Sequence, residues 1–367
     1  MLHILDMMHN VNKDGTHILL INMNTQINVA SNPIDFARLD HIFERSIGHR
    51  LPSNLSNILK GKNIIFSDTE KRLVPINGWG SRNNPYCPTT VKTIQPINEH
   101  TTISAIDSSS IQLAETEEGA LYAVKSGIAI AASGQTNSHF KIGPILFYLS
   151  EDILKHSELD RRLSKLILCD SESAKRLIRI RVERSIQLEL SSHFVKAIIL
   201  VDGPLKSSIF EDGKQSIKKV AENCSLYKNT MVGISKSTKL KILDRISLPL
   251  AKIKGPAYIE IDLIIKSLIQ NTIGDNLLVK FGNNNSSPIL RADVLTIDSD
   301  KNDSLGKLLG NDSIAGGYPE TLQLAHHIST FTNTEVSCLK SHVLNNYGVT
   351  ELASEDLRKK LLGSISI

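Results

Sequence analysis

The sequence has little of several features that mark particular classes of protein. Among its 367 residues there are four cysteines and one tryptophan, and aromatic residues make up only 5%. The cysteines are far apart and form no Cys-x-x-Cys pair, at Cys87, Cys169, Cys224 and Cys338. This spacing argues against a zinc site built from cysteines and favours buried, reduced thiols.

Long apolar runs are also missing. No stretch approaches the roughly 20 apolar residues that cross a bilayer, and residues 1–10 lack the basic start and apolar run of a secretory signal. We therefore expect a soluble, cytoplasmic protein. With 22% charged and 41% hydrophobic residues and a net charge of +4, the composition is that of a globular protein and only weakly favours nucleic acid as a partner.

Two hydrophobic runs in the sequence each end in an aspartate. Residues 103–107 end at Asp107 and residues 197–202 end at Asp202, and serines or a Gly-Pro pair follow. The runs predict buried strands, and the residues after them predict abrupt turns. Either aspartate alone could simply cap a turn. Two carboxylates brought together at strand ends would instead form an oxygen-rich site suited to Mg²⁺ or Mn²⁺.

The order of predicted elements favours a mixed α/β protein. Strands are expected at residues 102–107, 119–133, 142–149, 197–202, 230–235, 257–265, 277–281 and 290–297. Helices are expected at residues 150–193, 215–224, 319–332 and 351–362. Short connections among the first three strands favour antiparallel hairpins. This order suits an α/β sheet of the ribonuclease H type. Residues 1–100 look like a separate subdomain, in which Trp79 caps a core or stacks on a base.

A third acid is expected from the helix that precedes the Asp202 strand. Glu183 can point from this helix at the end of the sheet, and Glu189 is the alternative. Glu183 could instead form a surface ion pair with Arg179, four residues earlier, which would contribute only about 0.3–0.5 kcal/mol.

A Gly-Gly-Tyr-Pro segment at residues 316–319 leads into another predicted helix. Tyr318 would lie at the start of this helix. His326 follows two turns later, where its imidazole could bind a metal or contact a phosphate, or make a purely structural hydrogen bond. His327 is expected to be structural. Lys236 follows a predicted strand and could hold a phosphate by its charge or be simply solvated.

These motifs together resemble those of the archaeal NurA nucleases. The resemblance covers residues 102–342. It rests on Ile-Asp-Ser-Ser at 106–109, Val-Asp-Gly-Pro-Leu at 201–205, Val-Gly-Ile-Ser-Lys at 232–236, and Gly-Tyr-Pro with Leu-Gln-Leu-Ala-His at 317–326. Ser108 replaces a glycine that is usual in the family. The resemblance implies a ribonuclease H-like mixed sheet with flanking helices and a nuclease domain at residues 101–367. Residues 1–100 add little to it and are expected to be an N-terminal extension whose role is open, a dimer or partner surface being one option.

The resemblance also implies a function. It predicts a homodimeric DNA nuclease that depends on Mn²⁺ (or Mg²⁺), with 5′-to-3′ exonuclease and single-strand endonuclease activity. Such an enzyme processes single- and double-stranded DNA ends for recombinational repair with a HerA-type hexameric ATPase. A catalytically weak DNA-binding adaptor of the translocase is the alternative, although clustered carboxylates would repel DNA. An actin-like phosphotransferase is disfavoured, because the sequence has no Gly-rich phosphate loop.

Residue roles follow from the same resemblance. The residues that match the family's catalytic positions are Asp107, Glu183, Asp202, Tyr318 and His326. Of these, the two aspartates, the glutamate and the histidine would bind the metal, and Tyr318 would contact DNA together with Lys236. Further contacts with backbone phosphates are expected from Lys252, Lys254 and Arg291.

Overall fold

The computed structural model describes residues 54–66, 90–132, 135–157, 159–236, 243, 246–297 and 299–352. Predictions for Trp79, for Cys87 and for most of residues 1–100 and 351–362 lie outside these residues. The parts of residues 1–100 that are described, 54–66 and 90–100, carry strands of the main sheet. No helix in the described part of the chain is long and apolar enough to cross a bilayer.

Eleven strands form the main sheet of the described chain. They are β1 (Asn63–Phe66), β2 (Val91–Thr93), β3 (Ile103–Glu115), β4 (Gly119–Ala132), β5 (Gln135–Ser150), β6 (Ile198–Asp202), β7 (Thr230–Ser235), β8 (Ala257–Glu260), β9 (Asp275–Lys280), β10 (Leu290–Leu295) and β13 (Thr350–Glu351). A small second sheet pairs β11 (Ile314–Ala315) with β12 (Tyr318–Pro319).

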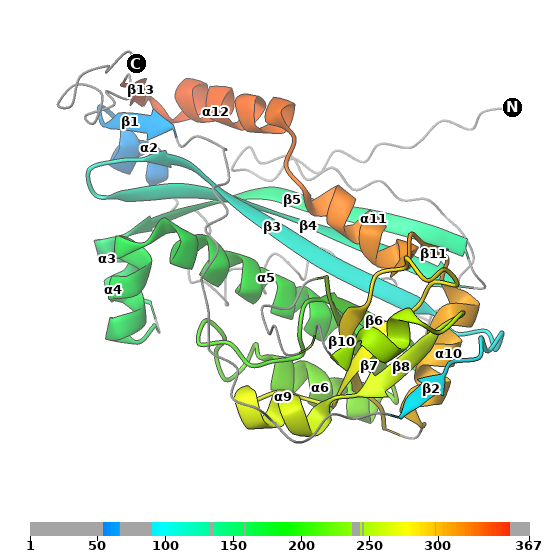
Figure 1. Ribbon diagram of the computed structural model, residues 1–367. Helices are drawn as coiled ribbons and strands as arrows, with labels where there is room; N and C mark the ends of the chain where they lie inside the picture. The colour runs from blue at the N-terminus through cyan, green and yellow to red at the C-terminus, as the bar shows by residue number, and fades with distance from the viewer. Residues whose placement is uncertain are drawn as a thin grey trace, which may run out of the picture.

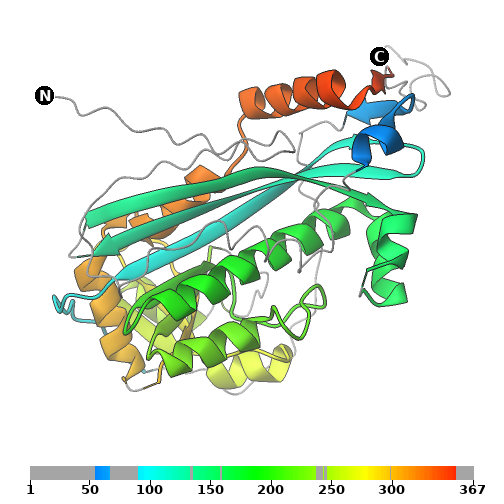
Figure 2. The ribbon, with the colours of Figure 1, turned by 180° about the vertical axis from the view of Figure 1, so that it is seen from behind.

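Helices lie on both faces of this sheet (Figure 1). They are α2 (Leu55–Leu59), α3 (Glu151–Lys155), α4 (Arg161–Cys169), α5 (Ser171–His193), α6 (Ile217–Leu226), α8 (Leu248–Ala251), α9 (Asp262–Leu268), α10 (Lys301–Asn311), α11 (Glu320–Ser329) and α12 (Asn333–Tyr347). The long α5 lies against one face of the β3–β5 ribbon, and α11 lies against the opposite face, as the view from behind also shows (Figure 2).

The strand order is that of a ribonuclease H-like sheet. The β3–β4–β5 strands are antiparallel, β6 pairs parallel with β3, and β7 pairs parallel with β6. Beyond β7 the sheet continues antiparallel through β10, β9, β8 and β2. The predicted α/β fold class, a ribonuclease H-like mixed sheet with flanking helices, is therefore confirmed.

Alternating side chains divide the core between the two faces of β3. Ile106 packs in the cluster that contains Leu177 and Val182 of α5. Ile103 and Ala105 pack in the cluster that contains residues of α11. Because successive strand residues point to opposite faces, Asp107 shares the face of Ile103 and Ala105. The carboxylate is therefore directed toward α11.

The prediction that a turn follows Asp107 is wrong. The strand β3 continues through the three serines to Glu115. Each serine hydroxyl finds a partner across the strand face: Ser108 bonds Ser126, Ser109 donates to the Ser329 carbonyl, and Ser110 donates to the Lys175 carbonyl. Polar residues that normally favour turns are tolerated in a strand when neighbouring elements satisfy their hydroxyl groups.

A second prediction is wrong for the residues after Ala257. The run at 257–265 was expected to form one strand, but β8 ends at Glu260 and α9 begins at Asp262. Ile264 and Ile265 are buried from this short helix. A short continuous apolar run has no periodicity that separates a buried strand from a buried helix. The helices α10 and α12 were not predicted.

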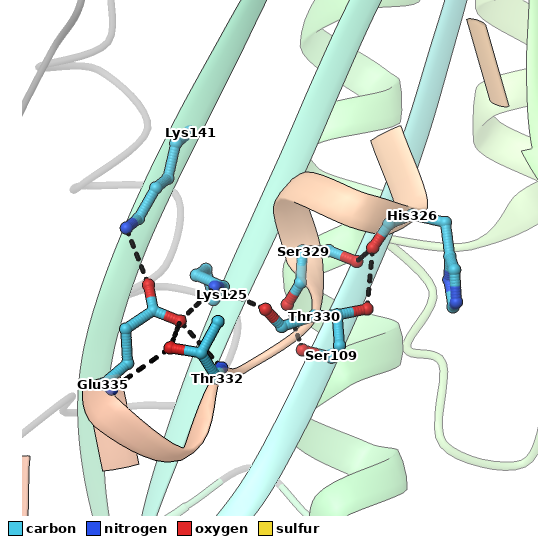
Figure 3. Close-up of polar contacts among 8 residues, drawn as sticks. All are labelled: Ser109, Lys125, Lys141, His326, Ser329, Thr330, Thr332 and Glu335. Atoms are coloured by element: carbon cyan, nitrogen blue, oxygen red, sulfur yellow. Dashed lines mark hydrogen bonds and ion pairs between the residues drawn. The ribbon is translucent and has the colours of Figure 1, made fainter. Parts of the chain in front are cut away.

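A buried ion pair joins the sheet to the α11–α12 junction (Figure 3). Lys125 of β4, which is 3% exposed, contacts Glu335 at 2.7 Å and donates to the Thr330 carbonyl. Lys141 of β5 contacts the other oxygen of the same carboxylate. Burial opposes ionisation of Glu335, but the hydrogen bonds from the two lysines lower its pKa to about 2. This carboxylate also completes the capping box that begins α12 with Thr332.

The described cysteines are free, as expected, but they are not all buried. Cys224 is buried, which raises the pKa of its thiol to about 12. Cys169 and Cys338 are exposed. The expectation of buried thiols is therefore wrong for these two residues, because they lie at solvent-exposed positions of α4 and α12.

Candidate metal centre

The parallel pairing of β3 with β6 places the two predicted aspartates side by side. In this register Ile106 is the partner of Val201, and the pairing ends there. Asp107 and Asp202 are the next residues of the two strands. Although β3 continues and β6 does not, the two carboxylates occupy equivalent positions at the end of the shared ladder.

Asp107 is buried and held by several donors. Its Oδ1 accepts the Ser108 backbone N–H at 2.8 Å, and its Oδ2 accepts the Ser329 hydroxyl at 3.0 Å. The Nδ1 of His326 lies 2.6 Å from the same Oδ2. Burial raises the pKa of Asp107, but the His326 bond and charge and the other two donors outweigh it and lower the pKa. The carboxylate is therefore ionised at neutral pH.

Asp202 lies at the solvent edge, where β6 gives way to a turn. Its side chain is 19% exposed, and its Oδ2 is 2.8 Å from the Nζ of Lys236. The same ammonium lies 5.4 Å from the centre of the Tyr318 ring. The positive-φ residue Gly203 turns the chain directly after the carboxylate.

The helix α11 approaches the sheet closely enough for His326 to reach both aspartates. Gly127 of β4 is the cross-strand partner of Asp107. A Cβ atom at Gly127 would lie 2.3 Å from the carbonyl oxygen of Ala325, so only glycine permits this contact. As a result, the Nδ1 of His326 is 2.6 Å from Asp107 Oδ2 and 3.9 Å from Asp202 Oδ2.

Three side chains thus form a set of potential metal ligands. One carboxylate oxygen each from Asp107 and Asp202 and one ring nitrogen of His326 lie within 4.8 Å of one another. Two carboxylates and an imidazole suit a hard or borderline divalent cation such as Mn²⁺. The chemistry and spacing of these donors fit such an ion. The predicted ligands Asp107, Asp202 and His326 therefore converge in the fold.

Glu183 approaches this set from the α5 side of the sheet. It is 8% exposed, and its carboxylate accepts from Gln187 at 3.1 Å and contacts Arg184 at 3.4 Å. Burial raises its pKa to about 7; the charge of Arg184 opposes this, whereas the negative charges of Asp107 and Asp202 add to it. The surface ion pair that was the alternative interpretation of Glu183 is not what the structure shows, because the carboxylate is buried.

Glu189 occupies a different face of α5. Six residues separate it from Glu183, which corresponds to a rotation of about 240° around an α-helix. Glu189 is partly exposed, whereas Glu183 is buried and senses the charges of both aspartates. Of the two alternatives, Glu183 is the buried glutamate whose pKa is raised by the charges of both aspartates, although its carboxylate is not one of the three groups whose ligand atoms converge.

An open groove of about 830 Å³ is lined by His326, one of the three potential ligands. The side chains that line it include Lys236, Tyr318, Gln323, His326, His327 and Thr330. Tyr318 is 8% exposed, and its hydroxyl has no hydrogen-bond partner within the described residues. Burial and then the charges of Asp202 and Asp107 raise the pKa of this hydroxyl, so it remains a neutral donor. His327, which was expected to be structural, is exposed on the groove wall.

Arg291 is not available to DNA, contrary to the prediction. It is 6% exposed and pairs with Asp293 on the same strand at 2.9 Å. Lys252 and Lys254, the other two predicted phosphate contacts, are exposed. An arginine in the middle of an apolar strand is buried with its partner, whereas lysines in a loop remain in water.

Ser329 is a ligand-holding residue that the sequence analysis missed. It donates to Asp107 Oδ2 at 3.0 Å. It follows His326 by three residues, and residues three apart share one face of a helix. Once His326 is assigned to the site, helical spacing alone is enough to find Ser329.

An acid-bearing edge on a sheet with this strand order defines the ribonuclease H-like class. The model of the NurA domain matches residues 101–330, which is more than half of the chain. The chain therefore belongs to the NurA family. None of the curated proteins matches it in sequence.

Several solved structures are similar to the chain at low identity. The NurA nuclease from Sulfolobus solfataricus is 16% identical, with 69% of this chain and 88% of that chain covered and a TM-score of 0.41. A NurA bound to dAMP and manganese is 13% identical, with 69% and 90% covered and a TM-score of 0.42. An endonuclease V from Bacillus subtilis is 14% identical, with 69% and 86% covered and a TM-score of 0.30.

Proposed function

We propose that this NurA-family protein is a metal-dependent deoxyribonuclease that hydrolyses phosphodiester bonds of DNA. The observation that carries the proposal is the convergence of Asp107, Asp202 and His326, whose ligand atoms lie within 4.8 Å of one another beside an open groove. The two carboxylates repel each other, and a bound cation would remove that repulsion, while the imidazole of His326 lies within reach of both carboxylates.

In this proposal Asp107, Asp202, Glu183 and His326 hold the cation. A divalent ion bound there supplies a Lewis acid that lowers the pKa of a water molecule and neutralises charge on the phosphate. Mn²⁺ fits this donor set better than Mg²⁺, because an imidazole nitrogen is a softer ligand than the oxygens that Mg²⁺ prefers. The hydrogen bonds from Ser108 and Ser329 keep Asp107 in one orientation.

Lys236 and Tyr318 hold the DNA strand. The Lys236 ammonium, half exposed and 2.8 Å from Asp202, is free to move to a phosphate when a cation takes over the carboxylate. The unpartnered Tyr318 hydroxyl is available to donate to a phosphate oxygen. Both groups line the groove, which places a substrate strand beside the ligands.

The wider function follows from family membership. We propose that the protein shortens DNA from 5′ ends and cuts single strands, as a cytoplasmic homodimer that works with a HerA-type hexameric ATPase in recombinational repair. In the described parts of residues 1–100, β2 is an edge strand of the sheet and β1 pairs with Ala114 and Glu115 at the far end of β3. Residues 1–100 remain our proposed dimer or partner surface.

The test is a cleavage assay on single- and double-stranded DNA labelled at the 5′ or 3′ end, with Mn²⁺, with Mg²⁺ or with a chelator. We expect metal-dependent shortening by the wild type and loss of at least about 100-fold in rate for Asp107→Asn and Asp202→Asn, which keep side-chain size and remove the charge. Asp152→Asn is the control, since Asp152 is a solvent-exposed acid of α3.

Two outcomes contradict the proposal. Retention of DNA without cleavage by the wild type would favour the adaptor of a translocase. Cleavage that survives both aspartate substitutions would show that the catalytic centre lies elsewhere. A HerA-type ATPase that neither co-elutes with the protein nor changes the rate of cleavage would contradict the proposed partnership alone.

A further inference from the structure

The turn that carries Asp202 is pinned from the opposite face of the sheet. After Asp202 the chain reverses through Gly203 and Pro204 to Leu205. The Gly203 N–H donates to the Ile234 carbonyl at 2.9 Å. The Leu205 N–H donates to Oδ2 of Asp293, a fully buried side chain on β10, at 3.0 Å.

A glycine makes this contact possible. Gly233 of β7 is the partner of Val201 on one side and of Asp293 on the other. A Cβ atom at Gly233 would lie 2.6 Å from the Gly203 carbonyl oxygen and 2.9 Å from the Leu205 side chain. The turn therefore folds back directly over β7, and the Asp293 carboxylate reaches it across the same gap.

Arg291 pairs with both carboxylate oxygens of Asp293 independently of the turn. Arg291 donates from Nε to Oδ1 and from Nη2 to Oδ2, each at 2.9 Å. The same Nη2 donates to Asn276 of β9. A buried ion pair of this kind can often be replaced by apolar side chains without loss of stability. What the carboxylate alone supplies is an acceptor for the Leu205 N–H, which would otherwise be buried without a partner.

From these contacts we propose that Asp293 is a positioning residue for the metal centre: it fixes the Asp202–Leu205 turn and so aims the Asp202 carboxylate at the ligand set. The inference rests on the proposed function for its effect on metal binding, but its effect on the turn is independent of any metal. Partners that orient a metal ligand typically contribute about 10- to 100-fold to metal affinity.

The test compares Asp293→Asn, Asp293→Leu and a control, Asn276→Leu, which removes another partner of Arg291 but no contact with the turn. Hydrogen–deuterium exchange of the peptide containing Leu205 is measured in metal-free protein, and Mn²⁺ affinity is measured by calorimetry. We expect the Leu205 amide to exchange about tenfold faster in Asp293→Leu, since one hydrogen bond is lost. The Mn²⁺ dissociation constant should rise about tenfold or more.

The other variants separate the loss of the hydrogen bond to Leu205 from a general loss of stability. Asp293→Asn keeps an oxygen acceptor, so its exchange and its Mn²⁺ affinity should stay within about threefold of the wild type. Asn276→Leu should lower the unfolding temperature and leave both readouts unchanged. If Asp293→Leu does not fold, the Arg291→Met/Asp293→Leu double variant removes the unpaired charge and is used in its place.

Equal protection of Leu205 in Asp293→Leu and Asn276→Leu would overturn the proposal, as would equal Mn²⁺ affinity of these two variants. A wild type that binds no Mn²⁺ would contradict the proposed function instead. In that case the exchange of Leu205 in metal-free protein still decides whether Asp293 holds the turn.

Discussion

Asp107 and Asp202 occupy equivalent positions beside one strand ladder, but the protein holds them in different ways. Asp107 is buried, lies within a strand that continues past it, and receives three hydrogen bonds that lower its pKa. Asp202 is at the end of its strand, is partly exposed, and contacts the exposed ammonium of Lys236. The first carboxylate is fixed directly by donors, whereas the second is fixed through its backbone.

The difference shows how one site can combine rigidity with exchange. A buried carboxylate that accepts three bonds has little freedom, so Asp107 keeps its orientation whatever occupies the site. The Lys236–Asp202 pair is exposed, and such pairs contribute only about 0–1 kcal/mol. A cation that competes with Lys236 for Asp202 therefore meets little resistance. Asp107 therefore fixes the position of the metal site, whereas Asp202 can exchange Lys236 for a bound cation.

The largest effect is expected when the partner of each aspartate is removed in turn. His326→Ala should weaken Mn²⁺ binding by about 100-fold, because it deletes a ligand and a donor to Asp107. Lys236→Met should strengthen Mn²⁺ binding, because its ammonium no longer competes for Asp202. Calorimetric titration of both variants checks the contrast. If both substitutions changed the Mn²⁺ dissociation constant in the same direction and by the same factor, Asp107 and Asp202 would not be held in different ways.

A second effect concerns Glu183, whose buried carboxylate is influenced by the charges of both aspartates. Its pKa of about 7 in the fold exceeds the ordinary value of 4.5, so between these values the folded metal-free protein binds more protons than the unfolded chain. The contribution of Glu183 to the free energy of unfolding is therefore greatest below about pH 4.5. It is lost as the pH rises from about 4.5 through about 7. The expected loss is about 3 kcal/mol, because the pKa rises from 4.5 to about 7 and one pKa unit corresponds to about 1.4 kcal/mol.

Glu183→Gln should remove this part of the pH dependence. Urea unfolding of the wild type and the variant at about pH 5 and about pH 8, without metal, measures it. A variant whose stability changes with pH as much as that of the wild type would show that Glu183 is ionised in the fold at both values.

Gly127, beside Asp107, and Gly233, beside the Asp202 turn, each allow another segment to approach the sheet closely. Substitution of either glycine should lower the free energy of unfolding by a similar amount. A Cβ at Gly127 meets the backbone of Ala325 in α11, and a Cβ at Gly233 meets the backbone of Gly203 in the Asp202 turn. Each change to alanine should destabilise the fold by about 1–3 kcal/mol, since the backbone must move. Gly213→Ala is the control, because nothing lies within 4 Å of its Cβ position. Denaturant unfolding measures the free energy of unfolding of all three variants and of the wild type.

The smallest effect is expected at Ser329. Its hydroxyl contributes one of the three bonds to Asp107, so Ser329→Ala should lower stability by about 1 kcal/mol and raise the pKa of Asp107. The rate of cleavage should then begin to fall at a higher pH on the acid side. Ser192→Ala is the matched control, since this exposed serine donates to a carbonyl of its own helix and accepts from Asn223, with no contact to Asp107. An identical pH profile of the two variants would contradict the role of Ser329.

Sequence patterns were most informative where a residue type is unusual for its neighbourhood. An aspartate after an apolar run is rare, and both Asp107 and Asp202 were found in this way. The patterns failed where polar residues are satisfied by distant elements. The serines after Asp107 favour a turn by local preference, but the partners that keep them in β3 come from β4, α5 and α11.

Sequence patterns predicted the central strands, the helix before β6, the two aspartates after apolar runs and the Gly-Tyr-Pro segment, because each depends on local periodicity and backbone preference. They did not predict α9, α10 or α12. The tertiary structure alone decided that α11 contacts the sheet at Gly127, that Glu183 and not Glu189 is buried near both aspartates, and that Asp293 reaches Leu205. These contacts join residues far apart in the chain. They depend on register and close packing, and no local pattern encodes either.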